Sequence, residues 1–212
     1  SPSSRKRAAP PIFPGRRPRT PTTSFYQRLL PAGFNRRGPA IAVGDLDGSG
    51  RDGVCIGGTT REARRVLLPQ GAEAWAPAAS PALAAPPDVD DGPLLLFDAT
   101  GDGRADLLVT AGGASQPAGA PEYPPRLFLN DGPGHFRPAP DGTLPPLSIS
   151  AGAACAADFD RDGRLDLFIG GRVSPGLYPA TPSSVLLANR GGRFADVTDA
   201  VAPMLRNVGM VT

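Results

Sequence analysis

The nine residues DFDRDGRLD, 158–166, place four aspartates close together in a single short stretch. Neighbouring carboxylates repel one another, yet this stretch lies between two apolar runs, AGAACAA before it and LFIGG after it. A folded protein tolerates such a concentration of negative charge where a positive charge compensates for it. The stretch recurs elsewhere in the sequence, and this recurrence indicates which positive charge that is.

The same pattern occurs twice more, as DLDGSGRDG at 45–53 and DATGDGRAD at 98–106. Each copy follows an apolar run and precedes another that ends in small residues, which is typical of a tight turn between two strands. A second predicted hairpin follows, clearest in RLFLNDGPGHF (126–136) and VLLANRGGRF (185–194), with VLLPQGAEAW (66–75) as a weaker version. The sequence therefore predicts four short antiparallel strands per repeat.

Four-stranded antiparallel units that recur every fifty to sixty residues are typical of β-propeller blades. We predict an all-β fold in which residues 24–212 form a partial propeller. Blade 1 is expected over about 39–91, blade 2 over about 92–148, blade 3 over about 149–203, and the start of a fourth blade at 204–212.

The acidic loops have the composition of a calcium site. Calcium takes six to eight oxygen ligands, and a short loop provides them by turning alternate side chains inward. Counted from the first aspartate, position 6 is glycine in all three loops, as a sharp turn requires. Positions 1, 3, 5 and 9 offer side-chain oxygens and position 7 its carbonyl. The predicted ligands are Asp158, Asp160, Asp162, Arg164 and Asp166 in loop 3; Asp98, Thr100, Asp102, Arg104 and Asp106 in loop 2; and Asp45, Asp47, Ser49 and Arg51 in loop 1.

The three loops differ in ligand charge, so we expect two calcium sites, in loops 3 and 2, and a third, weaker site in loop 1. Loop 2 has Thr100 in place of a carboxylate, and loop 1 has Gly53 at position 9. Asp-Gly pairs also form good hairpin turns without a metal, but three aligned copies favour the metal. An EF-hand needs an acidic residue at position 12, where Ile56, Val109 and Ile169 stand instead.

These residues resemble a known family. The repeated acidic hairpin, the following GG pair and LFLNDGPGHF (127–136) are similar to the FG-GAP, or VCBS, repeat of integrin α-subunit β-propellers. LFIGGRVSPGLYPATPSSVLLANRGGRFADVTD (167–199) and VGMVT (208–212) also resemble bacterial multi-repeat proteins similar to cartilage acidic protein. The resemblance covers about residues 39–212. It implies a calcium-stabilised propeller of about seven blades that is secreted, periplasmic or on the cell surface, serves adhesion or protein interaction, and has its remaining blades after Thr212.

A partner is expected on the disc face opposite the acidic loops. The predicted connections between second and third strands are long there, at 110–126 and 170–184, and they are stiffened by proline. Tyrosine and arginine are enriched at the energetic centres of interfaces. The alternative is that these side chains pack the loops onto neighbouring blades. The residues expected to contact a protein or glycan are Tyr123, Arg126, Arg172 and Tyr178.

Basic charge is concentrated at the N-terminus of the sequence. Residues 1–23 carry six basic residues and no acidic one, which leaves 16 basic and 20 acidic residues in the remainder. This Pro/Ser/Arg-rich segment lacks apolar periodicity, so we predict a disordered leader that is solvated and does not bind nucleic acid. No run approaches the roughly 18 apolar residues that a transmembrane helix needs.

The sequence contains no recognisable catalytic constellation. Its single histidine, His135, stands in the Gly-rich turn DGPGHF. We therefore expect a non-catalytic binding module; the alternative is a glycan-binding or accessory propeller domain of an extracellular polysaccharide-active enzyme. Cys55 and Cys155 stand in apolar strands and are expected to behave as small buried apolar residues, with a disulfide left open.

Overall fold

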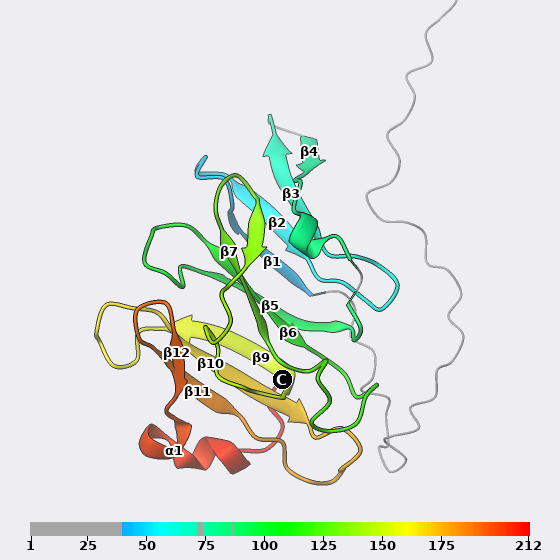
Figure 1. The fold of residues 1–212 in the computed structure, drawn as a ribbon, viewed down its shortest axis with the longest axis vertical. Coiled ribbons are helices and arrows are strands. Elements are labelled where there is room, and N and C mark those ends of the chain that lie inside the picture. The colour runs from blue at the N-terminus through cyan, green and yellow to red at the C-terminus, as the bar shows by residue number, and fades with distance from the viewer. Residues whose placement is uncertain (1–39, 72–73, 86) are drawn as a thin grey trace, which may run out of the picture.

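The described chain consists of short antiparallel strands with very little helix (Figure 1). The structure, a computed structural model, describes residues 40–71, 74–85 and 87–212. The prediction of an all-β fold is confirmed, whereas the predicted leader, residues 1–23, lies outside the described residues. The helical elements in the described part are three short turns: η1 (Pro81–Leu83), α1 (Thr198–Val201) and η2 (Pro203–Asn207).

The strands form three consecutive groups of four, which we call units 1, 2 and 3. Within each unit the strands pair antiparallel in sequence order. In Figure 1 unit 1 lies at the top and unit 3 at the bottom. Unit 1 contains β1 (Ile41–Asp45), β2 (Asp52–Ile56), β3 (Arg65–Gln70) and β4 (Ala74–Pro77); unit 2 contains β5 (Asp91–Phe97), β6 (Asp106–Ala111), β7 (Arg126–Asn130) and β8 (Phe136–Pro138); unit 3 contains β9 (Ser150–Ala157), β10 (Asp166–Val173), β11 (Val185–Asn189) and β12 (Phe194–Asp196).

Each acidic loop joins the first strand of its unit to the second, as predicted. The glycine at position 6 has a positive φ in all three loops, +74° at Gly50, +83° at Gly103 and +88° at Gly163. A side chain with a β-carbon rarely adopts this conformation. The glycine thus allows the chain to reverse within a few residues and return as the second strand.

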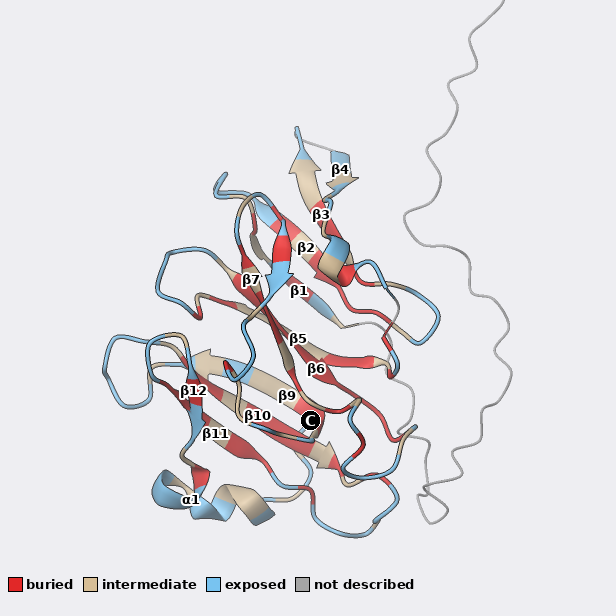
Figure 2. Cartoon of the chain, viewed as in Figure 1, coloured by how far each residue is buried: buried red, intermediate tan, exposed pale blue. Residues whose placement is uncertain are grey.

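The core lies between the units, where each sheet packs on its neighbour. We call the side of a unit that faces the next unit its front face, and the side that faces the preceding unit its rear face. β6, between the other two units, is buried along its whole length (Figure 2). The cluster between units 1 and 2 includes Ala42, Leu46, Cys55 and Val66 from the front face and Leu107, Val109, Phe128 and Phe136 from the rear face. The cluster between units 2 and 3 includes Phe97, Ala99, Leu108 and Leu127, packed against Leu167, Ile169, Val185, Leu187 and Phe194.

Polar contacts also join units 1 and 2. The carboxylate of Asp91, the first residue of β5, lies 2.7 Å from the guanidinium of Arg64, and both side chains are almost completely buried. The other oxygen of Asp91 accepts the N–H of Gly58 at 2.6 Å. Because a buried carboxylate is costly unless it is paired and hydrogen-bonded, these contacts fix the start of unit 2 against the β2–β3 connection of unit 1.

The chain end differs from the prediction. Residues 204–212 were expected to start the first strand of a fourth blade, but Pro203–Asn207 form the 3₁₀ turn η2 and residues 208–212 form no strand. Proline at the first position of the turn favours this conformation. Val211 nevertheless donates a backbone hydrogen bond of 2.9 Å to Gly171. Gly171 is the counterpart of Ala111, which pairs with Ser150 of the next unit.

The two cysteines lie in different environments. Cys55 is buried between units 1 and 2, as predicted, and burial raises the pKa of its thiol to about 12. Cys155 is exposed, so the prediction that it is buried is wrong, and the two thiols are not bonded to each other. Cys155 lies on the front face of unit 3, against which no further sheet packs in the described part of the chain.

The packing between units 2 and 3 leads to a stability prediction. The rings of Phe194 and Phe97 meet edge to face with centroids 6.1 Å apart, and Phe194 is 5% exposed. Replacing Phe194 with Ala should lower the free energy of unfolding by about 3–5 kcal/mol, because a buried ring leaves a cavity. Denaturant unfolding measures this. Phe159→Ala, at a phenylalanine that is 36% exposed, is the control, and an equal loss in both variants would contradict the described core.

Candidate metal centre

Three of the predicted ligands in loop 3 converge. One carboxylate oxygen from each of Asp158, Asp160 and Asp166 lies within 4.8 Å of the other two. Asp166 is buried and Asp160 is exposed, so the group lies where the core meets the surface. This is the one such acidic group found in residues 40–71, 74–85 and 87–212. Loop 3 is therefore the first candidate for a cation site.

The aspartate at position 1 shapes each loop by accepting backbone N–H groups. In loop 3, Asp158 accepts the N–H groups of Asp162 and Gly163, both at 3.0 Å. Loops 1 and 2 repeat this arrangement, which satisfies donors that the tight turn would otherwise leave without partners. Asp45 accepts from Asp47, Gly48, Ser49 and Gly50, and Asp98 accepts from Gly101, Asp102 and Gly103.

The aspartate at position 9 has a different environment. Asp166 is 1% exposed and accepts the N–H of Phe159 at 3.1 Å and that of Asn189 at 2.7 Å. Asp106 is equally buried and accepts the N–H of Ala99 at 3.0 Å and that of Asn130 at 2.9 Å. The carboxylate at position 9 thus connects its own loop to the end of the third strand.

The two asparagines complete a link between units that the sequence analysis missed. The side-chain amide of Asn189 donates to Leu165 at 3.1 Å and to Ala99, in loop 2 of the preceding unit, at 2.9 Å. Asn130 donates in the same way to Ala105 and to Leu46 in loop 1. The recurrence of Asn before a Gly-containing turn, in NDG and NRGG, was the available signal.

Loop 1 lacks both the aspartate at position 9 and the asparagine of the third strand that make this link. Gly53 stands at position 9, and Pro69 stands at the place in β3 that Asn130 and Asn189 occupy in β7 and β11. Proline has no N–H to donate, and glycine has no carboxylate to accept. A β-carbon on Gly53 would lie 2.7 Å from a methyl carbon of the buried Leu46, which fills this space. Loop 1 therefore has the weakest ligand set.

The position 5 carboxylates lie outside the converging group. Asp162 pairs with the guanidinium of Arg164 and accepts its backbone N–H at 3.0 Å. In loop 2 Asp102 and Arg104 make the same pair at 2.6 Å, and the Arg104 N–H followed by the Arg104 charge lowers the pKa of Asp102. Arg190 lies 3.1 Å from Asp160, so cationic side chains offset part of the loop charge.

The predicted partner residues do not form one surface. Tyr123 is 1% exposed, and its hydroxyl donates to the carbonyl of Gln116 at 3.0 Å. The expectation that Tyr123 contacts a partner is therefore wrong, because its ring packs the loop onto Val89 and Ala111. Arg126 lies 3.3 Å from Asp91, within the protein, whereas Arg172 and Tyr178 are half-buried in the second long loop and remain predictions.

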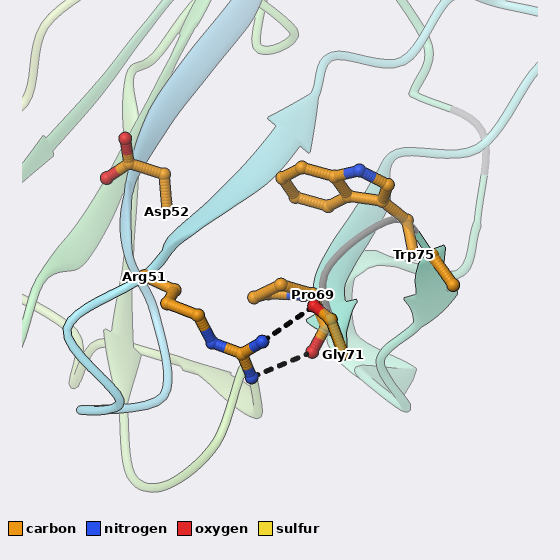
Figure 3. Close-up of a pocket in the computed structure, with 6 residues that line it drawn as sticks. Arg51, Asp52, Pro69, Gly71 and Trp75 are labelled. Atoms are coloured by element: carbon orange, nitrogen blue, oxygen red, sulfur yellow. Dashed lines mark hydrogen bonds between the residues drawn. The ribbon is translucent and has the colours of Figure 1, made fainter.

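A separate hollow lies on unit 1, beside loop 1. Its volume is about 470 Å³, and Figure 3 shows the indole of Trp75 on one side and the guanidinium of Arg51 on the other. Arg51 donates to the carbonyls of Gly71 at 2.8 Å and Pro69 at 3.4 Å. The side chain of Arg51 thus ties loop 1 to the end of β3, and its backbone carbonyl stays a predicted ligand.

The pKa values of the aspartates at positions 1 and 9 should be shifted in opposite directions. The hydrogen bond from the N–H of Gly50 lowers the pKa of Asp45 below 3.8, and the neighbouring N–H groups add to this effect although partial burial opposes it. Burial raises the pKa of Asp106 above 3.8. Stability due to Asp45 is therefore present above pH 3.8 and lost as pH falls through its folded pKa. Stability due to Asp106 is full below pH 3.8 and decreases as pH rises through its folded pKa.

Carbon-detected NMR of the side-chain carboxyl groups measures both values, with the protein kept in chelator so that no cation competes. Assignment follows from Asp45→Asn and Asp106→Asn spectra. Shifts of the two pKa values in the same direction would contradict the described difference in environment.

One comparison with known proteins concerns the acidic loops directly. A family model described as an FG-GAP-like repeat matches residues 98–169, from the first aspartate of loop 2 to β10. No curated protein matches the sequence. A solved structure of an Agrocybe aegerita lectin, described as recognising non-reducing terminal N-acetylglucosamine, is similar at 21% identity and a TM-score of 0.46. The similarity covers 74% of this chain and 36% of the lectin chain, so the chain spans little more than a third of that structure. The part of the chain that is similar to an FG-GAP-like repeat, residues 98–169, contains acidic loops 2 and 3.

Proposed function

We propose that the chain is a calcium-stabilised, non-catalytic propeller module that acts outside the cell or in the cell envelope and binds a protein or a glycan. The observation that carries the calcium assignment is the convergence of Asp158, Asp160 and Asp166 in loop 3. The FG-GAP-like repeat supports a binding module built from recurring units. No helix in the described residues is long and apolar enough to cross a membrane.

The donor set fits calcium. Calcium lies 2.3–2.6 Å from its oxygen ligands, so two oxygens on the same ion are at most about 5 Å apart. The separations in loop 3, all within 4.8 Å, meet this condition. The group contains only carboxylates, which suit calcium better than zinc, a metal that prefers nitrogen and sulfur ligands. A bound calcium ion would supply the positive charge that three adjacent carboxylates lack.

Calcium in loop 3 would stabilise the junction between units 2 and 3. Asp158 and Asp160 belong to the loop, whereas Asp166 begins β10 and holds the N–H of Asn189. The amide of Asn189 in turn reaches the carbonyl of Ala99 in loop 2. Fixing Asp166 therefore also fixes the asparagine that spans the two units.

The proposal of a binding role rests on the partners that the polar side chains of the loops and turns have within the protein. His135, the single histidine of the sequence, is half exposed in the β7–β8 turn and lies 2.5 Å from Asp131. The position 1 and position 9 carboxylates accept backbone N–H groups. The remaining candidate for partner contact is the loop of Leu177, which is 57% exposed, and Tyr178.

Calcium should raise the melting temperature of the protein, and Asp160→Asn should remove part of that increase. A ligand that binds only the native state at one hundred times its dissociation constant adds about 2.7 kcal/mol of stability. Asp160 is the best position to change, because it is exposed and its loss leaves the bonds of Asp158 and Asp166 intact. Calorimetric titration should show one calcium ion fewer per chain.

The control variant is Asp141→Asn, which removes the same charge from an exposed turn outside the acidic loops. It should retain the full calcium response. An unchanged melting temperature in the original sequence, or the same number of bound ions in Asp160→Asn, would refute the loop 3 site.

A further inference from the structure

The carboxylate at position 9 uses its two oxygens in the same way in loops 2 and 3. One oxygen of Asp166 accepts the N–H of Phe159, at position 2 of its own loop, and the other accepts the backbone N–H of Asn189, the last residue of β11. In loop 2 the two oxygens of Asp106 are divided in the same way. Each of these carboxylates therefore holds its own loop and the end of the third strand together.

Ala99, at position 2 of loop 2, is held at both ends of its backbone. Its N–H donates to Asp106 of its own loop at 3.0 Å, and its carbonyl accepts from the side-chain amide of Asn189 in unit 3 at 2.9 Å. Because Asp166 holds the N–H of the same asparagine, the two acidic loops are joined without a break. Four residues form this set of hydrogen bonds, which we call the inter-loop network: Asp166, Asn189, Ala99 and Asp106.

The same pattern reaches loop 1 but ends there. Asp106 accepts the backbone N–H of Asn130, and the amide of Asn130 donates to the carbonyl of Leu46, at position 2 of loop 1. The N–H at position 2 donates to the position 9 aspartate in loops 2 and 3, whereas loop 1 has Gly53 at that position. Loop 1 is therefore linked to unit 2, but it has no position 9 carboxylate to hold that link in place.

Every side chain of the inter-loop network is buried. Asp166, Asn189 and Asp106 are 1%, 2% and 1% exposed, and Ala99 is completely buried. A buried donor or acceptor that loses its partner is costly, because no water replaces the lost bond. Hydrogen bonds that share members also strengthen one another in a site that excludes water. The network is therefore made or broken largely as a unit, and a change at one end alters the other end.

A cation in loop 3 acts on this network through Asp166. In the absence of an ion, three carboxylates with oxygens within 4.8 Å of one another repel, which favours displacement of Asp166 from its hydrogen bonds. A bound cation attracts all three and favours Asp166 in the position in which it holds Asn189. An ionised carboxylate has about four lone-pair sites, so Asp166 can bind an ion without releasing either N–H.

We propose that occupation of loop 3 by calcium is transmitted through Asn189 to loop 2, so that loop 2 binds calcium more tightly when loop 3 is occupied. The inference rests on the proposed calcium site in loop 3 and adds the regulation of one site by another. Loop 2 is the site that gains, because Asp102 pairs with Arg104 and no converging acidic group is found in loop 2 of the described structure. By linkage, calcium in loop 2 strengthens binding in loop 3 by the same factor.

A calcium titration of the full chain, followed by NMR, tests the coupling. The backbone amides of Gly103 and Gly163 report loops 2 and 3 separately, because each donates to the first aspartate of its own loop. Asp160→Asn weakens the loop 3 site without touching the inter-loop network. It should raise the calcium concentration that half-saturates the Gly103 signal at least about five-fold, which is the lower end of typical coupling between two sites.

Asn189→Ala separates transmission from ion binding. It keeps the backbone N–H that Asp166 accepts and removes the amide that reaches Ala99. Gly163 should still respond to calcium, because Asn189 is a positioning residue and offers no ligand to loop 3. The half-saturating concentration at Gly103 should rise as it does in Asp160→Asn, and adding Asp160→Asn to Asn189→Ala should change it less than about two-fold.

Asn130→Ala is the matched control. It removes the equivalent amide, which reaches loop 1 and not loop 2 of the neighbouring unit. Each asparagine also accepts an N–H in its own turn, so the two variants have equivalent local losses. The five-fold effect of Asp160→Asn on the Gly103 signal should therefore persist in Asn130→Ala.

Three outcomes would overturn the proposal. Equal half-saturation of the Gly103 signal in the original sequence, in Asp160→Asn and in Asn189→Ala would show that the loops bind independently. A response of Gly163 without one of Gly103 would exclude transmission and leave the loop 3 site intact. No response of Gly163 would refute the loop 3 site itself, and the inference with it. If Asn189→Ala does not fold, the comparison of the original sequence with Asp160→Asn still decides between coupled and independent loops.

Discussion

Packing between neighbouring four-stranded units is the interaction on which the rest of the structure depends. A single sheet of short strands has two faces and cannot cover either of them by itself. The buried aromatic and aliphatic side chains therefore lie at the two junctions, in one cluster between units 1 and 2 and another between units 2 and 3. Each fully buried side chain of this kind contributes about 1.5–3 kcal/mol. The acidic loops lie at the edge of these junctions, so their geometry follows from the packing.

The aspartates of one loop have two distinct roles, and this division explains why the three loops are not equal. The aspartate at position 1 holds the turn, and all three loops have it. The aspartate at position 9 is buried and holds the N–H of an asparagine that also reaches the preceding loop, as in Asp166 and Asn189. Loop 1 has Gly53 and Pro69 at these places and keeps the turn without the link. The residues of the candidate metal centre are therefore also structural residues.

Local features of the fold could be predicted from the sequence, because they depend on near neighbours in the chain. The hairpins follow from alternating apolar residues and from glycines such as Gly163 that require a positive φ. The burial of Tyr123 and the exposure of Cys155 depend instead on which segment covers them, and sequence periodicity does not report that. The pairing of Asp162 with Arg164 was missed for a related reason. The spacing of the aspartates predicts that Asp162 faces a metal ion, but it does not show that the guanidinium of Arg164 lies close enough to pair with it.

The two asparagines show what each internal junction has beyond apolar packing. At both junctions an asparagine amide donates to the carbonyl at position 2 of the preceding loop, from Asn130 to Leu46 and from Asn189 to Ala99. Leu46 and Ala99 are almost completely buried, so a backbone carbonyl there is costly unless it accepts a hydrogen bond. Apolar packing is not directional, whereas this hydrogen bond has one donor and one acceptor. The asparagine therefore fixes how one sheet is placed on the next, and the packed side chains supply most of the stability of the junction.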